Sequence, residues 1–318
     1  MSVFQMIIVS LFEGLGNQMF QYAMARRLAE KHSTVLKLDV SSFESNKQRQ
    51  YGLHCFNIQE HIATQDEIDA LLKRPRNKFE RFNNKLLNKI GKVSRPSQNF
   101  FLEKYFHFDP CVLEAPNNTY LHGFWQSEKY FIDIQDILIN EFSFKYPQDD
   151  TNRDLNEKIK FHESTAIHIR RGDYINNDET NQLHEVCSLD YYNKSITYIA
   201  ERVSNPHFFI FSNDLQWVKE KFQINFPITI IEYNNGFRSY EDLRLMSQCK
   251  HNIIANSSFS WWGAWLNQNP DKIVCVPQQW FRKKYQDTKY SLPKDCIPWY
   301  KDDFLDTKDL IPKNWIQL

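Results

Sequence analysis

The chain has 318 residues, of which 42% are hydrophobic and 25% charged, and its formal net charge is +0. This length favours about two domains with separate cores, and the neutral charge gives no support to nucleic-acid binding. Six cysteines lie far apart without a CxxC pair, which predicts reduced thiols in a cytoplasmic protein and no zinc site. No stretch approaches the roughly 18 apolar residues that a membrane-spanning helix needs.

The start of the chain predicts a βαβ unit. We expect a strand over residues 3–9, a glycine-containing loop over 13–18, a helix over 18–31 and a second strand over 34–39. A right-handed crossover makes such strands parallel. Residues 60–150 are less regular. The polar, proline-bearing segment 145–153 predicts a boundary between a domain of residues 1–150 and one of residues 151–318.

The second half alternates between strand and helix patterns. Strands are expected at 165–169, 207–211, 228–232, 252–255 and 272–276, with helices near 190–203, 214–223, 239–249 and 261–267. This alternation is typical of a doubly wound parallel sheet. The fold class predicted for the whole chain is therefore α/β, with two Rossmann-like domains and a cleft between them.

Polar residues follow several predicted strands, where open parallel sheets bind their ligands. His168 and Arg170 fall on one face of their strand by alternation. The planar charged fork of arginine suits phosphate oxygens. Ser257, Ser258 and Ser260 precede or open the helix near Trp261, and the N–H groups at such a helix start suit a diphosphate.

Each of these residues also has a structural interpretation. Arg170 could be the ion-pair partner of Asp173, and His168 could be a hydrogen-bonded core histidine. The segment 212–214 could be a helix cap. Asp214 could instead accept hydrogen bonds from a guanine or hold a ribose, and the sequence does not choose between these two. The loop is not a dinucleotide fingerprint, because Met19 stands at the third glycine position.

Five motifs in order resemble the α-1,2-fucosyltransferases of glycosyltransferase family 11. They are GLGNQMFQYA (14–23), HGFWQSEKYF (122–131), HIRRGDY (168–174), FSND (211–214) and NSSFSWWGAWLN (256–267). The resemblance implies a GT-B fold, with two Rossmann-like domains facing across a cleft. It also implies inverting transfer of L-fucose from GDP-β-L-fucose to the 2-hydroxyl of a galactose. Glu13 departs from the pattern, since bacterial members usually have glycine there.

The resemblance also implies roles for the domains and for particular residues. Domain 1–150 would be the acceptor side, and domain 151–318 would bind GDP-fucose. Trp125 and Gln126 are predicted to contact the acceptor. The predicted donor contacts are Asn17, Gln18, His168, Arg170, Ser212, Asp214, Ser257, Ser258, Phe259 and Ser260.

Transfer of a fucosyl group requires stabilisation of the departing GDP and an acceptor for the hydroxyl proton. Arg170 is predicted to stabilise the leaving phosphate. Asp173 is the first candidate for the base and His168 the second. The chain has no DxD triplet of the kind that holds a metal in many glycosyltransferases, so neither a metal nor a cofactor is expected.

Residues 73–95 contain nine basic residues and one acid, Glu80, a local balance of 9 − 1 = +8. Phe79, Phe82, Leu86 and Ile90 recur at helical spacing. One interpretation is a helix lying on the inner face of an anionic membrane, which would suit a lipid-linked glycan acceptor. The other is a solvated helix docked through its apolar stripe.

Two alternatives to α-1,2-fucosyl transfer remain at the level of sequence. One is a fucosyltransferase that acts on another hydroxyl or on protein, because the HxR core occurs there as well. The other is a carbohydrate-binding protein without turnover, against which the arginine and serine clusters argue. The sequence fixes neither the acceptor, a galactose-terminated oligosaccharide or a lipid-linked glycan, nor the oligomeric state.

Overall fold

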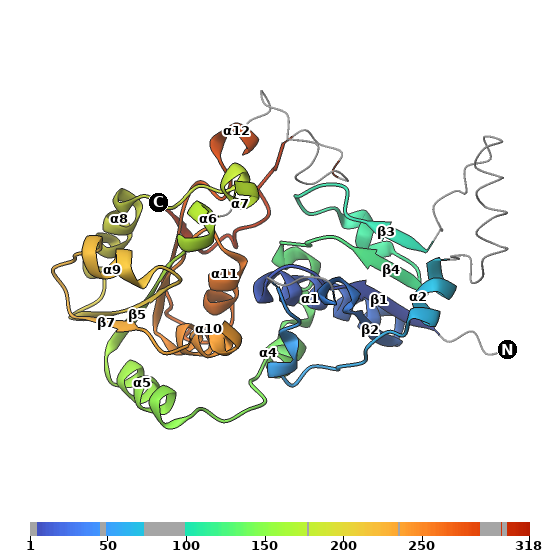
Figure 1. Cartoon of the computed structure of the whole chain (residues 1–318), viewed down its shortest axis with the longest axis horizontal. Helices are drawn as coiled ribbons and strands as arrows, with labels where there is room; N and C mark the ends of the chain where they lie inside the picture. Colours follow the sequence, from blue (N-terminus) through green and yellow to red (C-terminus); the bar gives the residue numbers. More distant parts are fainter. Residues whose placement is uncertain are drawn as a thin grey trace. The chain divides into compact units, whose positions relative to one another are not determined.

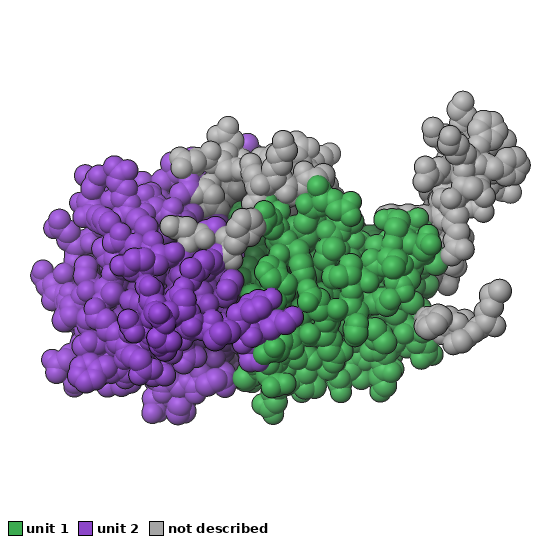
Figure 2. Space-filling model, turned by 60° about the horizontal axis from the view of Figure 1, so that its bottom comes forward, with its two compact units in different colours: residues 1–142, 299–301 green, residues 143–298, 302–318 purple. Residues whose placement is uncertain are grey.

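The computed structural model describes residues 5–44, 49–72, 99–176, 178–234, 236–286, 300 and 304–318. The chain divides into two compact units (Figures 1 and 2): unit 1 is residues 1–142 with 299–301, and unit 2 is residues 143–298 with 302–318. The division after Phe142 precedes helix α5 (Asp150–Phe161), whereas the boundary predicted at 150/151 lies inside its first turn. Asp149 caps this helix by accepting the N–H of Asn152.

Unit 1 contains a four-stranded sheet in the order β2-β1-β4-β3, in which every neighbouring pair is parallel. The strands are β1 (Met6–Ser10), β2 (Val35–Asp39), β3 (Phe100–Leu102) and β4 (Thr119–His122). Helix α1 (Leu15–His32) connects β1 to β2, so the predicted βαβ unit is confirmed. The sequence did not predict β3 and β4, which are short and lie in the region of irregular pattern.

Helices pack against this sheet through apolar side chains. Helix α1 lies against β1 and β2, and α2 (Gln65–Leu72) contributes Ile68 and Leu71 to a cluster with Ile8 and Tyr120. The shorter helices of unit 1 are η1 (Ser41–Phe43), η2 (Leu53–Cys55), η3 (Pro110–Glu114), η4 (Glu128–Tyr130), η5 (Ile132–Ile134) and α4 (Gln135–Glu141).

Unit 2 contains a six-stranded parallel sheet in the order β10-β9-β8-β5-β6-β7. Its strands are β5 (Glu163–Ile169), β6 (Pro206–Ser212), β7 (Ile228–Ile231), β8 (His251–Ile253), β9 (Val274–Val276) and β10 (Ile316–Gln317). The first five coincide with the predicted strands, apart from their ends. The two-residue β10 was not predicted.

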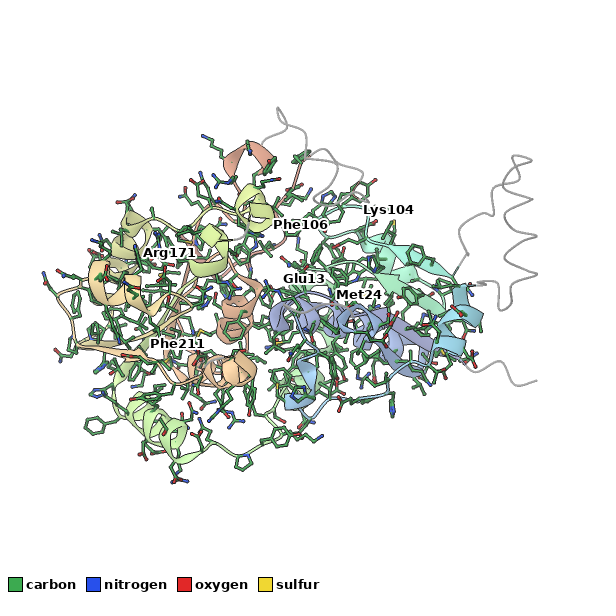
Figure 3. All side chains as sticks on the ribbon, in the orientation of Figure 1. Glu13, Met24, Lys104, Phe106, Arg171 and Phe211 are labelled. Carbon is green, nitrogen blue, oxygen red and sulfur yellow. The ribbon has the colours of Figure 1, made fainter. Side chains whose placement is uncertain are left out.

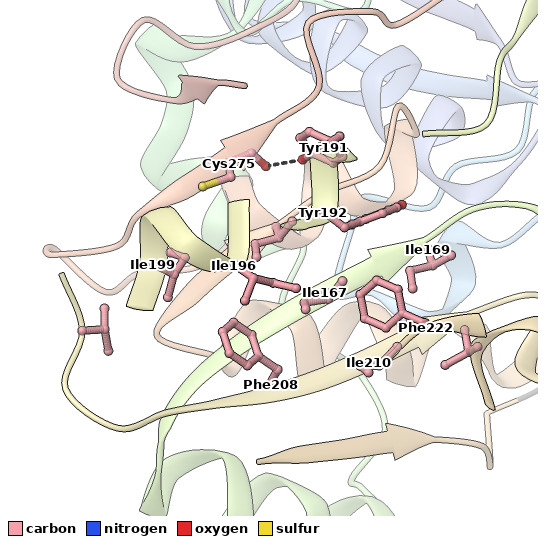
Figure 4. Close-up of a cluster of buried hydrophobic side chains, with 13 residues drawn as sticks. Ile167, Ile169, Tyr191, Tyr192, Ile196, Ile199, Phe208, Ile210, Phe222 and Cys275 are labelled. Atoms are coloured by element: carbon pink, nitrogen blue, oxygen red, sulfur yellow. Dashed lines mark hydrogen bonds between the residues drawn. The ribbon is translucent and has the colours of Figure 1, made fainter. Parts of the chain in front are cut away.

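Helices cover both faces of this sheet, which confirms the predicted doubly wound fold. On one face, Ile167 and Ile169 of β5 pack with α8 (Leu189–Ala200) and α9 (Leu215–Lys221) (Figure 4). On the other face, Ala166 packs with α5 and α10 (Ser239–Gln248). The remaining helices are α6 (Gly172–Asn176), α7 (Asp178–Leu183), η6 (Gly236–Arg238), α11 (Ser258–Trp265) and α12 (Lys283–Gln286).

Two further predictions concern the membrane and the cysteines. None of the helices in the described ranges is long and apolar enough to cross a membrane. The predicted basic helix over 73–95 lies outside the described residues. The described cysteines, Cys55, Cys111, Cys187, Cys249 and Cys275, are free, and the reduced state of the thiols stays a prediction.

Glu13 has a backbone conformation that fits the glycine expected at this position from the resemblance. Its φ angle is 65°, in the left-handed region that a side chain disfavours. The Glu13 carbonyl accepts a hydrogen bond from Gln18 Nε2 at 2.9 Å, which holds the turn at the start of α1. Its carboxylate lies 3.6 Å from Arg49 Nε near the surface, a contact of small energetic value.

We predict that Glu13→Gly keeps or raises the free energy of unfolding, by up to about 1 kcal/mol, because glycine removes the left-handed penalty. Glu13→Val should instead lower it, since a β-branched residue fits this region worse. Urea denaturation of the two variants measures the difference. Equal midpoints for Gly and Val would contradict this explanation.

Candidate functional site

The strand order of unit 2 creates a switch point between β5 and β8. From β5, the strands β6 and β7 follow on one side, and β8, β9 and β10 follow on the other. The connections on the two sides of such a point run in opposite directions, so the carboxyl ends of its strands border the usual ligand crevice of an α/β sheet. The polar segments after β5, β6 and β8 therefore come together at one edge of the sheet.

His168 lies near the end of β5 and is only 4% exposed. Its ring centroid is 5.8 Å from that of Phe259, in the first turn of α11. The His168 carbonyl accepts a hydrogen bond from Tyr192 on α8 at 3.1 Å. The structure thus brings two predicted donor-site residues together from separate motifs.

Asn213 joins the segment after β6 to the segment after β5. Its Oδ1 accepts the backbone N–H groups of Arg171 at 2.9 Å and Gly172 at 3.1 Å. A Cβ atom at Gly172 would lie 2.9 Å from the Asn213 carbonyl oxygen, closer than real contacts allow. Glycine is therefore required for the approach of these two segments. Asn213 lies in the FSND motif, whose residues 212–214 were interpreted as a possible helix cap; its bonds to the backbone of Arg171 and Gly172 were not predicted.

Arg171, which Figure 3 labels, has structural contacts within unit 2. Its guanidinium lies 4.7 Å from the centroid of the Trp217 ring, and its Nε is 3.3 Å from Asp214 Oδ2. This is an ion pair without the geometry of a hydrogen bond, because the Nε–H finds no hydrogen-bond acceptor. The other oxygen, Asp214 Oδ1, caps α9 by accepting the N–H of Trp217 at 3.1 Å.

Asp214 and Ser212 therefore have the helix-cap arrangement that the sequence allowed. Ser212 Oγ accepts the N–H of Asp214 at 3.0 Å, and both oxygens of Asp214 have partners in the protein. The predicted contact of Asp214 with guanine or ribose stays a prediction. Any such contact shares an oxygen with these internal partners.

Arg170 directly follows β5, and Tyr174 connects it to the segment before α11. Its guanidinium lies 5.9 Å from the centroid of the Tyr174 ring, and the Tyr174 hydroxyl donates to the Asn256 carbonyl at 2.7 Å. Asn256 is 1% exposed, and its Nδ2 donates to the carbonyls of Glu185 and Trp280, both at 2.9 Å. These bonds fix the backbone that leads into α11.

The N-terminus of α11 has no side-chain cap. Ser257 is the N-cap residue, but its side chain accepts no hydrogen bond from the helix. In α5, α8 and α9 of the same unit, Asp149, Ser188 and Asp214 make that bond. The first N–H groups of α11 are therefore left for another acceptor. Ser258 and Phe259 in this turn are partly exposed, whereas Ser260 is buried.

Asp173, the first candidate for the catalytic base, belongs to α6, which begins at Gly172 immediately after the arginines. Its side chain lies outside the described parts of the structure. The role of Asp173 as the catalytic base stays a prediction, with a role in holding the arginines as its alternative. His168, the second candidate, is buried against Phe259 as described above.

The predicted residues of unit 1 also gather at one end of their sheet. Gln18 is fully buried, and its amide bonds to the backbone of Glu13, Gln50 and Gly52, so it holds the loop. Asn17 Oδ1 accepts a hydrogen bond from Gln126 Nε2 at 2.8 Å. This bond links a predicted donor contact to a predicted acceptor contact. Trp125, predicted to contact the acceptor, is 0% exposed, so its indole has no surface for a sugar in this conformation.

Glu103, which the sequence analysis did not identify, follows β3 and is 1% exposed. Its carboxylate accepts the N–H groups of Phe124 at 2.7 Å and Trp125 at 2.9 Å, and the hydroxyl of Tyr300 at 2.7 Å. Burial raises the pKa of Glu103 to about 7, against the opposing effect of these donors. No signal in the sequence marks it, because it is a single glutamate in the irregular region.

Among the described residues, no group of three or more His, Cys, Asp or Glu side chains is placed to hold a metal ion. The expectation of a reaction without a metal or cofactor stays a prediction. The polar groups that do gather in unit 2 are arginine, serine and helix N–H groups, which are ligands for anions.

An arginine-bearing loop and an uncapped helix lie at the switch point of the parallel sheet, the usual place of a ligand in an α/β protein. The model of glycosyl transferase family 11 matches residues 6–294. The chain belongs to this family and is therefore a glycosyltransferase, as the motifs indicated.

Several curated proteins are similar over most or part of the chain. An alpha-1,2-colitosyltransferase of Escherichia coli is 34% identical, covering 87% of this chain and 93% of the relative. The O-antigen biosynthesis glycosyltransferase WbnK of Escherichia coli is 35% identical, covering 84% and 92%. Galactoside alpha-(1,2)-fucosyltransferase 1 of Rattus norvegicus is 25% identical, covering 60% and 52%. The protein is thus a family 11 glycosyltransferase whose relatives include an alpha-1,2-colitosyltransferase and an alpha-(1,2)-fucosyltransferase.

Among solved structures, NodZ alpha-1,6-fucosyltransferase soaked with GDP-fucose aligns with a TM-score of 0.46 at 13% identity. The alignment covers 82% of this chain and 92% of that one. At this level of similarity the alignment does not assign function to individual residues.

The raised pKa of Glu103 predicts a specific pH dependence of stability. Its pKa is about 7 in the folded protein and near the ordinary 4.5 in the unfolded chain, so the folded state holds the proton more tightly. The stabilisation is complete below about pH 4.5 and is lost as the pH rises through 7, by up to about 3 kcal/mol.

Urea unfolding at pH 5 and pH 8 measures this effect as the difference between wild type and Glu103→Gln. The wild type should lose more stability between the two pH values than the variant. Asp242, whose pKa burial also raises to about 7, keeps its contribution in both proteins and cancels. Parallel pH profiles of the two proteins would contradict the assignment to Glu103.

Proposed function

We propose that this enzyme transfers L-fucose from GDP-β-L-fucose to the 2-hydroxyl of a galactose, with inversion at the anomeric carbon. The observation that carries the proposal is the convergence of the Arg170 loop, His168 and the uncapped N-terminus of α11 at one switch point. A diphosphate suits this convergence, because it has negative oxygens for both the guanidinium and the helix N–H groups.

The step breaks the bond between the anomeric carbon and the phosphate oxygen, and the electron pair stays on GDP. The galactose 2-oxygen bonds to the opposite face of the anomeric carbon, and its proton passes to a base or to solvent. Arg170 and the first N–H groups of α11 would stabilise the charge that grows on GDP. Asp173 is the proposed base and His168 the alternative. Both lie within three residues of Arg170 in the sequence.

The remaining predicted contacts are part of the same proposal. Ser257, Ser258, Phe259 and Ser260 would surround the diphosphate, through the backbone of α11 and the partly exposed side chains of its first turn. In unit 1, Asn17 and Gln126 would present their hydrogen-bonded amides to the substrates. The acceptor would be a galactose-terminated oligosaccharide or a lipid-linked glycan. The O-antigen relative favours bacterial glycan biosynthesis in the cytoplasm.

A second candidate donor is GDP-colitose, because one of the relatives is an alpha-1,2-colitosyltransferase. Colitose lacks one hydroxyl group of fucose. A site that forms hydrogen bonds to this hydroxyl would discriminate strongly against a sugar without it. The choice between the two donors therefore depends on a polar group near the sugar.

The experiment that tests the function is a transfer assay with GDP-fucose or GDP-colitose and a panel of β-galactosides, followed by linkage analysis of the product. We expect transfer from GDP-fucose to O2 of galactose. Preferred transfer from GDP-colitose would select the second candidate. Nucleotide hydrolysis without transfer, or a bond to another hydroxyl, would contradict the proposal.

We predict that Arg170→Ala lowers kcat about 10²-fold or more, the usual effect of losing one donor to a developing negative charge. Arg153→Ala is the matched control, since Arg153 lies in the same unit and only pairs with Asp150 on an exposed helix face. Steady-state kinetics of the two variants should differ by this factor. A near-normal kcat in Arg170→Ala would remove Arg170 from the mechanism.

A further inference from the structure

The loop after β4 in unit 1 has a strained conformation that requires support. Trp125 has a φ angle of 57°, in the left-handed region that a large side chain disfavours. Its ring is nonetheless fully buried and contacts Tyr130 edge-on at 5.7 Å between centroids. Non-glycine residues keep this conformation only where the surroundings determine it, and such positions are concentrated at functional sites.

The support comes from the Glu103 carboxylate, which lies beneath the loop. Oε2 accepts the N–H of Phe124 and Oε1 accepts that of Trp125, so one side chain fixes two successive peptide groups. A carboxylate is a stronger acceptor for N–H groups than a neutral side chain. It also satisfies the buried N–H of Trp125 and the partly buried N–H of Phe124.

Gly123 makes room for this carboxylate. A Cβ atom at this position would lie 2.3 Å from Glu103 Cβ and 2.8 Å from Trp125 Cε2. No side chain can occupy that space, so the end of β3 and the loop after β4 are in direct contact. This contact is the second independent sign that the loop is built around Glu103.

Tyr300 completes the arrangement from a distant part of the sequence. Its hydroxyl donates to Glu103 Oε2 at 2.7 Å, across 197 residues of chain. Its ring meets that of Phe106 at 6.4 Å (Figure 3 labels Phe106). Residues 299–301 group with unit 1, although the chain before and after them groups with unit 2. These two contacts join Tyr300 to the end of β3 in unit 1.

The loop leads directly to predicted substrate contacts. Gln126 follows Trp125 and is 7% exposed. Its Nε2 donates to Asn17 in the first turn of α1. A change in the backbone of Phe124 or Trp125 would shift Gln126 and break this bond. The chain of contacts therefore runs from Tyr300 through Glu103 and the loop to Asn17.

We propose that Glu103 and Tyr300 are positioning residues for sugar transfer: together they hold the loop 123–126 in the conformation that presents Gln126 beside Asn17. The proposal rests on the proposed function for its catalytic consequence. Neither residue need touch a substrate, since both act through the backbone of the loop.

The test compares Tyr300→Phe and Glu103→Gln with the wild-type enzyme. Tyr300→Phe removes one hydroxyl from the carboxylate, and Glu103→Gln replaces one accepting oxygen by an amide N–H₂ group. We expect kcat/KM for the acceptor to fall between about 10- and 100-fold, the effect of small misplacement at a reacting centre. Amide hydrogen exchange in a peptide covering the loop should become faster in both variants.

Tyr22→Phe is the matched control. The Tyr22 hydroxyl also donates to a buried carboxylate of unit 1, Glu141 at 2.6 Å, and accepts the N–H of Gln59. This control therefore loses as many hydrogen bonds as Tyr300→Phe, or more, without affecting the loop. Its melting temperature should fall, while its kcat/KM and the exchange rate of the loop should stay near the wild-type values.

Two results would overturn the proposal. One is a kcat/KM of Tyr300→Phe within about twofold of that of Tyr22→Phe at a similar melting temperature, the resolution of such a comparison. The other is unchanged exchange of the loop in Tyr300→Phe, which remains measurable if Glu103→Gln does not fold. Absence of transfer in the wild type would overturn the proposed function. Faster exchange in the variants would then still support the role of Glu103 and Tyr300 in holding the loop 123–126.

Discussion

The organisation of the site depends on one constraint, the parallel pairing of β5 with both β6 and β8. This pairing brings three polar segments from distant parts of the sequence to the same edge of the sheet. The connections diverge on either side of β5, which makes that edge the usual ligand crevice of such a sheet. The arginine loop, whose backbone Asn213 fixes, and the start of α11 can therefore act on one ligand.

Two kinds of polar group lie at this edge. Some form their hydrogen bonds and ion pairs within the protein, and others adjoin the site where a ligand would bind. Asn213 and Asn256 use their amides internally to fix the backbone around the site. Arg171 and Asp214 pair with each other. Arg170 and the first N–H groups of α11 are the cationic and dipolar groups that adjoin the site. In unit 1, Glu103 has the same backbone-fixing role, but it uses a buried carboxylate where unit 2 uses amides.

Most of unit 2 could be predicted because its strands are long or strongly apolar and alternate with helices. The rule that polar residues after parallel strands meet at one edge also predicted that His168 lies near the segment 257–260. It did not find β3, β4 or Glu103, because short strands lack a period and a lone glutamate has no local signature. Trp125 shows a different limit: its motif was identified, but the left-handed backbone that buries it depends on Glu103 from another strand. The left-handed backbone of Glu13 likewise has no signal in the sequence, except that the residue differs from the glycine expected at this position of the motif.

The central claim is that the carboxyl edge of unit 2 binds the diphosphate of a guanine nucleotide. Titration calorimetry of the wild-type chain and Arg170→Ala with GDP, ADP and UDP tests it most directly. We expect the wild type to bind GDP more tightly than ADP or UDP, and Arg170→Ala to lose at least about tenfold in GDP affinity, as is usual for a charge-assisted contact to phosphate. Equal binding of the three nucleotides, or unchanged GDP affinity in the variant, would contradict it.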